Sequence, residues 1–111
     1  MQPPIVQSTL ISQPDFRPLV ERYIADLPPI IARIHDLLAQ DDMIQLARQL
    51  HRLKGSGGGY GFAQLSILAA EAEKAVAAGQ CEVVESAVAG LVNYIRSIAG
   101  YCREAETQRP G

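Results

Sequence analysis

Apolar side chains recur at helical spacing in four stretches of this 111-residue chain, and this pattern constrains the fold more than any other feature. The stretches cover residues 15–38, residues 42 into the glycines at 55–59, residues 62–78 and residues 82–103. No stretch alternates apolar and polar residues with the period of two that is typical of strands. Because links of only a few residues join amphipathic helices as antiparallel neighbours, the sequence predicts an all-α, antiparallel up-and-down four-helix bundle.

The chain has the length of one domain, and we expect the bundle to span residues 14–104. Residues 1–13 combine prolines, polar side chains and scattered aliphatics, so they predict a short N-terminal arm or extra helix outside the core. The polar residues 105–111 are expected to fray as a C-terminal tail. A domain of this size buries roughly two-thirds of its unfolded surface and is stable without disulfides.

Two places interrupt the helical patterns. Pro28 and Pro29 remove two backbone donors, so either two short helices meet there or one helix bends. Gly55, Gly57, Gly58 and Gly59 each lower helix stability by about 1 kcal/mol relative to alanine. The second helix, which Asp42 begins as N-cap, must therefore end in this run or be held there by packing. Gly79 is a natural stop for the third helix.

Composition argues against several functional classes. Ten basic and twelve acidic residues give a net charge of −2 without a block of like charge, which disfavours nucleic acid and anionic membranes as partners. Without Trp, and with four Tyr and two Phe, the chain has little aromatic surface for stacking bases. No apolar run approaches the roughly 20 residues of a membrane span, and residues 1–4 do not resemble a signal peptide. We therefore expect a cytoplasmic location.

The cysteines and histidines do not have the spacing of a metal site. Cys81 and Cys102 lie in no C-x-x-C pattern, and we expect both to be reduced and structural. His35 lies at the edge of the first apolar stripe with only Asp36 as an acidic neighbour. The sequence therefore predicts no bound metal.

His51 faces away from the buried stripe of its helix. On a wheel of about 100° per residue, His51 falls roughly 125° from the centre of the stripe, which is a solvent-facing position. In its neutral form an exposed imidazole offers a ring-nitrogen lone pair as a nucleophile, and Lys54 at i+3 places an ammonium suited to an anion on that nitrogen. The alternative interpretation is a surface histidine beside a surface lysine.

The residues that follow His51 carry a specific resemblance. Residues 51–62 read HRLKGSGGGYGF, and Leu65 follows. This segment resembles the signature of histidine-containing phosphotransfer (Hpt) domains of two-component phosphorelays. The signature joins the histidine to an aliphatic residue at +2, Lys at +3, Gly at +4, a small residue at +5, Gly at +10 and an apolar residue near +14, and this chain has all of them. Leu50 departs mildly from the small residue expected before the histidine.

The resemblance extends more weakly over residues 15–103 and implies a four-helix bundle in which Pro28 is a bend inside one helix. It further implies that His51 accepts a phosphoryl group at Nε2 from a receiver-domain aspartate and passes it to another receiver. Lys54 would steady the phosphoryl oxygens, and Gly55 would leave room for the receiver's loops. The chain itself would bind no cofactor, because Mg²⁺ would belong to the receiver. We expect a monomer whose partners are response-regulator receiver domains and a hybrid histidine kinase.

The surface around His51 would select these partners, although one sequence does not reveal the partner's identity. The residues predicted to bind the partner lie near His51 on the wheel or just after the helix. They are Ile44, Ala47, Arg48, Arg52, Gly55, Gly58 and Tyr60.

A variant of this function is a phosphoryl-accepting domain fed directly by a chemotaxis-type kinase. Phe62 after Gly61, and Glu73 at 22 residues after His51, both occur in such domains, where the glutamate tunes the histidine. Those domains also have a second histidine near the glutamate, and here Ala70 occupies that position. The ordinary interpretation of Glu73, which we favour at this point, is a solvated charge beside Lys74.

Two further alternatives belong to other functional classes. A helical adaptor could bind a receiver or a histidine kinase without carrying phosphate, but such an adaptor needs neither His51 nor Lys54. An ATP-dependent enzyme is disfavoured, because the glycine run matches neither G-x-x-x-x-G-K-[ST] nor G-x-G-x-x-G. Ser56 lacks the G-x-S-x-G context of a nucleophilic serine. We therefore expect neither autokinase activity nor ATP binding.

Overall fold

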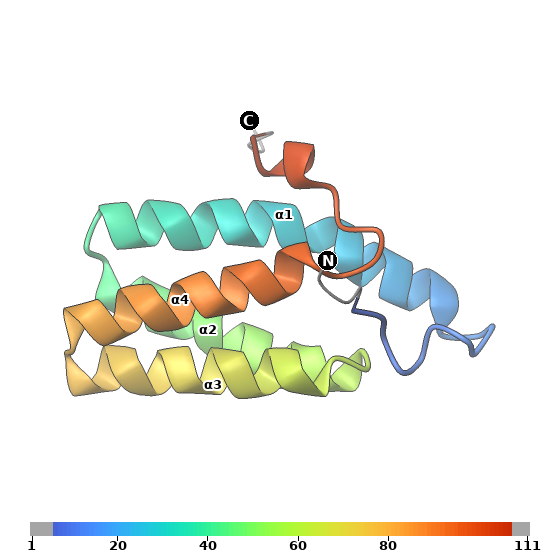
Figure 1. Ribbon diagram of the computed structural model, residues 1–111, viewed down its shortest axis with the longest axis horizontal. Helices are drawn as coiled ribbons and strands as arrows, with labels where there is room; N and C mark the ends of the chain where they lie inside the picture. Colours follow the sequence, from blue (N-terminus) through green and yellow to red (C-terminus); the bar gives the residue numbers. More distant parts are fainter. Residues whose placement is uncertain (1–5, 108–111) are drawn as a thin grey trace, which may run out of the picture.

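The computed structural model describes residues 6–107 as a bundle of four α-helices and one short 3₁₀-helix (Figure 1). The elements in chain order are α1 (Arg17–Ala39), α2 (Met43–Gly59), α3 (Ala63–Ala78), α4 (Cys81–Arg96) and the 3₁₀-helix η1 (Arg103–Thr107). Links of two or three residues connect α1 to α4, so successive helices run antiparallel. The described residues contain no strand beyond one isolated bridge between Val6 and Ile98. The predicted all-α four-helix bundle is confirmed.

One core of buried apolar side chains holds the four helices together. Leu27, Leu50 and Leu91 are among its fully buried members, and each contributes roughly 1.5–3 kcal/mol by removing its side chain from water. Helix α3 contributes mainly small side chains, because Ala69, Ala72 and Ala75 are buried. These alanines allow α2 and α4 to pack closely on either side of α3.

Helix α1 continues through both prolines. Pro28 is buried and Pro29 is exposed inside a single helix of 23 residues, and Figure 1 shows a change of direction near the middle of α1. A proline lacks the N–H that the helix interior needs, which normally costs about 3 kcal/mol. Leu27 and Ile31 flank the prolines and are buried in the core, so packing offsets this loss. Of the two alternatives, the single bent helix is confirmed.

The glycine run remains helical as far as Gly59, because α3 holds it in place. The Cα of Gly57 lies so close to Leu65 that an added Cβ would come within 2.7 Å of Leu65 Cδ2. The N–H of Gly58 donates to Ser66 Oγ at 2.8 Å, and the Ser66 hydroxyl donates to the carbonyl of Lys54 at 2.6 Å. Packing therefore extends α2 beyond the point where helix propensity would end it.

Helix α4 ends at Arg96, and the predicted extent to residue 103 is wrong. The chain after Arg96 pairs with the N-terminal arm: the Val6 N–H donates to the Ser97 carbonyl at 3.0 Å, and the Ala99 N–H donates to the Val6 carbonyl at 2.8 Å. Gly100 then adopts a φ of 90°, which a helix does not allow. The apolar pattern of residues 82–103 did not reveal that the distant N-terminal arm pairs with the residues that would otherwise continue α4.

Cys102 consequently lies outside α4. Both Cys102 and Cys81 are free thiols and both are exposed, so neither has the structural packing role that the sequence predicted. Cys81 is the first residue of α4, where its side chain does not face the core.

The N-terminal arm packs across the end of the bundle beside the link between α2 and α3 (Figure 1). Ser8 is buried and donates a hydrogen bond to the Tyr60 carbonyl at 2.6 Å, and the Thr9 N–H donates to the Gly61 carbonyl at 3.1 Å. The close approach of Ser8 and Thr9 leaves no room for a Cβ at Gly61, whose φ is 85°. The arm therefore helps to define the turn that ends α2.

The beginning of the C-terminal tail is also ordered, against the expectation of fraying. Glu106 in η1 accepts hydrogen bonds from Arg96 at 2.7 and 3.0 Å and from the Tyr101 hydroxyl at 2.6 Å. Burial and the nearby Glu106 carboxylate raise the pKa of Tyr101. The rest of the tail, residues 108–111, and the start of the arm, residues 1–5, lie outside the described residues.

Candidate functional site

Helix α2 holds His51 at the surface on a turn that packs against the core. The side chain of His51 is 67% exposed, whereas Leu50 before it and Leu53 after it are buried in the core. The outward position predicted from the helix wheel is confirmed. Because the two buried leucines fix this turn of the backbone, the position of the His51 Cα is defined while the imidazole ring stays accessible.

Glu73 on α3 determines which ring nitrogen is available. Its Oε2 lies 3.0 Å from Nδ1 of His51. An ionised carboxylate only accepts hydrogen bonds, so in the neutral ring Nδ1 carries the hydrogen and Nε2 carries the lone pair. The arrangement therefore leaves Nε2 as the nucleophilic nitrogen of a solvent-exposed imidazole.

The favoured interpretation of Glu73 as a solvated charge beside Lys74 is therefore wrong. Glu73 is half-buried between α2 and α3, and Lys74 points into solvent. The antiparallel register of α2 and α3 brings Glu73 and His51, 22 positions apart in sequence, to one level. The glutamate occupies the position that the comparison with chemotaxis-type domains singled out.

Lys54 completes a three-residue cluster with His51 and Glu73. Its Nζ lies 3.0 Å from Oε1 of Glu73, so the two carboxylate oxygens hold the lysine and the histidine side by side. The hydrogen bond from Lys54 lowers the pKa of Glu73, and the hydrogen bond from His51 acts in the same direction against partial desolvation. Glu73 is thus a carboxylate at neutral pH and keeps an ammonium one turn away from the ring.

Gly55 and Gly58 are exposed on the side of α2 that carries His51. A Cβ added to Gly55 would meet no atom within 4 Å, so nothing inside the bundle requires glycine there. Gly58 is likewise exposed, and an added Cβ would lie 3.3 Å from Ser66 Oγ. Gly57 differs from both, because Leu65 fills the space beside it. The absence of side chains at Gly55 and Gly58 allows another macromolecule to approach the imidazole.

The sequence was compared with known proteins. The model of the Hpt domain family matches residues 18–108, which is most of the chain and extends from the second residue of α1 beyond the end of α4. The chain belongs to the Hpt domain family. Searches of curated proteins and of solved structures returned no significant match. Membership implies histidine phosphotransfer in phosphorelays and interaction with receiver domains and kinases.

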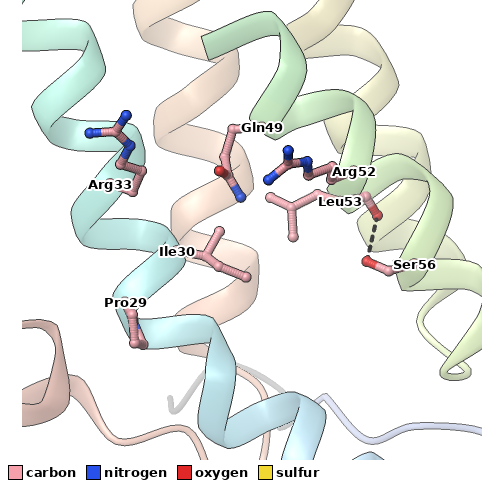
Figure 2. Close-up of a pocket in the computed structure, with 7 residues that line it drawn as sticks. All are labelled: Pro29, Ile30, Arg33, Gln49, Arg52, Leu53 and Ser56. Carbon is pink, nitrogen blue, oxygen red and sulfur yellow. Dashed lines mark hydrogen bonds between the residues drawn. The ribbon is translucent and has the colours of Figure 1, made fainter. Parts of the chain in front are cut away.

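The predicted partner-binding residues of this Hpt domain divide into two groups. Most lie on the exposed side of α2 that carries His51: Ile44, which is 71% exposed, half-buried Ala47, and the exposed Arg48, Gly55 and Gly58. Arg52 instead extends toward α1 (Figure 2). Tyr60 is half-buried and stacks on Tyr23 with ring centroids 4.3 Å apart. Their roles in partner binding remain predictions.

Sequence reasoning missed Ser66. Its hydroxyl bridges Lys54 and Gly58, which are the i and i+4 residues of one turn of α2, and so supports the turn that carries the lysine. A serine on the polar side of α3 gives no sequence signal for such a role. The missed contact depends entirely on the packing of α3 against α2.

The described residues show no site for a metal ion and no membrane span. Residues 6–107 contain no group of three or more His, Cys, Asp or Glu that could hold a metal. None of the helices in that range is both long enough and apolar enough to cross a bilayer.

Proposed function

We propose that this Hpt domain carries a phosphoryl group on Nε2 of His51 and transfers it between the aspartates of receiver domains. The observation that carries the proposal is the 3.0 Å contact between Nδ1 of His51 and Glu73, which leaves Nε2 exposed with its lone pair. Family membership supplies the reaction class. The geometry supports one nitrogen of one residue as the carrier.

The transfer balances with the groups at hand. The Nε2 lone pair attacks phosphorus of the aspartyl phosphate, a nitrogen–phosphorus bond forms, and the phosphorus–oxygen bond to the aspartate breaks. The aspartate leaves as a carboxylate, and no proton needs to move. The ring keeps its hydrogen on Nδ1 and becomes cationic, so the Glu73 carboxylate stabilises the charge that develops during transfer.

Lys54 would act on the phosphoryl group itself. Its Nζ is held 3.0 Å from Glu73, and an ammonium has three hydrogens, so it can turn one toward the phosphoryl oxygens without leaving the carboxylate. Phosphoryl transfer is mainly positioning and charge neutralisation, which are the contributions that Lys54 and Glu73 can make.

The remaining components would come from the partners. In this scheme the chain binds no cofactor, and Mg²⁺ is held by the receiver domain. A hybrid histidine kinase would supply the first receiver, and the protein would act as a cytoplasmic monomer. The aspartate and its metal would approach His51 over Gly55, where no side chain of this chain obstructs them.

A second candidate function is a phosphoryl-accepting domain fed directly by a chemotaxis-type kinase. The His51–Glu73 contact favours it, since that glutamate position was one of its two sequence indicators, with Phe62 after Gly61. Ala70, where such domains have a second histidine, argues against a complete network of that kind. Labelling by an isolated kinase with ATP, in the absence of any receiver, would favour this second candidate.

The direct test is phosphoryl transfer from a phosphorylated receiver domain to the purified chain. We expect a label that is lost in acid and stable in alkali, which is typical of phosphohistidine, and that His51→Gln abolishes. His35→Gln is the matched control, because His35 is an exposed histidine on α1 outside the cluster, and it should be labelled like the wild type. Label that persists in a folded His51→Gln protein would refute the proposal.

The adaptor and the ATP-dependent enzyme give different outcomes. A receiver that binds the folded chain without labelling it would support the adaptor. A titration with ATP should show no binding and no autophosphorylation, in line with the failed nucleotide motifs.

A further inference from the structure

A groove lies between α1 and α2 (Figure 2). Its volume is about 390 Å³, and α1 contributes Pro29, Ile30 and Arg33, whereas α2 contributes Gln49, Arg52, Leu53 and Ser56. Figure 2 shows the Gln49 amide lying between the two arginines, with Arg52 extending toward it and the Arg33 guanidinium turned outward. The groove therefore combines an apolar floor with cationic side chains on both rims.

The charge of this region is opposite to that of the whole chain. Helix α2 carries Arg48, Arg52 and Lys54 and contains no Asp or Glu, although the chain as a whole has a net charge of −2. Lys54 is paired with Glu73, but neither Arg33 nor Arg52 makes an ion pair within residues 6–107. Two unpaired guanidinium groups are suited to bind carboxylates through paired hydrogen bonds.

The groove lies within reach of a partner centred on His51. A stable protein interface buries about 800 Å² on each partner, which corresponds to a disc of roughly 16 Å radius. Packed helices lie only about 8–10 Å apart, so a disc centred on His51 extends over the neighbouring helix α1. Arg48 and Gly55 occupy wheel positions between His51 and Arg52, so the exposed surface of α2 is continuous from the imidazole to the groove.

We propose that the α1–α2 groove, with Arg33 and Arg52 on its rims, binds an acidic segment of the receiver domain that docks on His51. This proposal rests on the proposed function and adds to it a residue on α1 that contributes to partner choice. The apolar floor at Ile30 and Leu53 accommodates the aliphatic part of such a segment, and Gln49 offers both a donor and an acceptor for its backbone.

The test compares charge reversals on one helical surface. The probe is a phosphorylated receiver, chosen from a panel as the one that labels the wild type fastest. We expect the double variant Arg33→Glu/Arg52→Glu to lower kcat/KM for transfer about tenfold or more, because like charges now face the partner. Arg22→Glu is the matched control: Arg22 is exposed on α1, about 16 Å nearer its N-terminus, which is two screening lengths at physiological salt.

Three readouts decide the outcome. Transfer to the wild type should slow as salt rises, whereas transfer to the double variant should not slow, because salt screens the repulsion between the introduced glutamates and the acidic segment. The double variant should melt cooperatively, which shows that it is folded. Its rate of transfer from the phosphorylated receiver should fall more than its rate of labelling by phosphoramidate, a small donor that does not reach the groove. Transfer within twofold of the wild type, or an equal loss in Arg22→Glu, would overturn the groove proposal. If no receiver and no phosphoramidate label the wild type, the proposed function itself fails.

Discussion

Glu73 on α3 accepts a hydrogen bond from Nδ1 of His51 on α2 at 3.0 Å, and its second oxygen holds Nζ of Lys54 at the same distance. One carboxylate thus sets the tautomer of the imidazole and the place of the ammonium. The two helices meet at this carboxylate on the exposed side of the bundle. Its removal should therefore affect transfer more than folding.

Glu73→Gln should slow transfer to His51 by about tenfold, because the neutral amide no longer stabilises the positive charge that develops on the ring. Single-turnover transfer from a phosphorylated receiver measures this effect. Glu71→Gln, an exposed neighbour on the same helix, is the control, and equal loss in both variants would contradict the role of Glu73.

Lys54→Ala should slow transfer by about tenfold to a hundredfold while the bundle remains folded, because Lys54 is 40% exposed and contributes little to the core. Lys54→Arg retains the positive charge and should recover part of the rate. Quench-flow measurement of transfer, together with thermal melting of each variant, tests this prediction. A Lys54→Ala protein that transfers at the wild-type rate would show that the ammonium does not act on the phosphoryl group.

Gly55→Ala and Gly57→Ala should have opposite effects on stability. At Gly55 an added methyl group meets no atom within 4 Å, so the better helix propensity of alanine should stabilise the protein by up to about 1 kcal/mol. At Gly57 the methyl group would collide with Leu65, and we expect a loss of about 1–3 kcal/mol. Urea denaturation measures both changes.

The transfer rate of Gly55→Ala should change in the opposite direction from its stability. If a receiver approaches over Gly55, the alanine there should slow transfer although it stabilises the fold. An increase in stability together with an unchanged transfer rate would show that the partner does not come close to this position.

The ion pair between Glu106 and Arg96 should make stability depend on acid pH. Hydrogen bonds from Arg96 lower the pKa of Glu106 from 4.5 to about 2. A carboxyl group with a lowered pKa stabilises the folded state above pH 4.5, and this contribution disappears as pH falls from 4.5 toward 2. Glu106→Gln should therefore cost about 1–3 kcal/mol at pH 7 and much less near pH 2.5.

Denaturation of the wild type and of Glu106→Gln at both pH values measures this difference. Glu85→Gln is the control, because Glu85 is an exposed carboxylate on α4. An equal destabilisation by Glu106→Gln at pH 7 and pH 2.5 would mean that the contact stabilises through packing and not through charge.

The sequence by itself determined the helical fold, the outward direction of His51 and the family. Helical periodicity specifies which side of each helix is apolar, and Leu50 and Leu53 therefore place His51 at the surface whatever the other helices do. The spacing from His51 to Gly61 and Leu65 is a local pattern, so it was readable without a structure.

Only the tertiary structure decided the features that depend on neighbours distant in sequence. The glycine run of α2 stays helical because Leu65 and Ser66 pack against it, and α4 ends early because Val6 pairs with the chain that follows. Glu73 meets His51 because α2 and α3 pack antiparallel in one particular register. Helical periodicity shows which face of a helix is buried, but it does not show which residues of two packed helices lie opposite each other. The chemistry of this site depends on that axial register, because it places Glu73 beside His51.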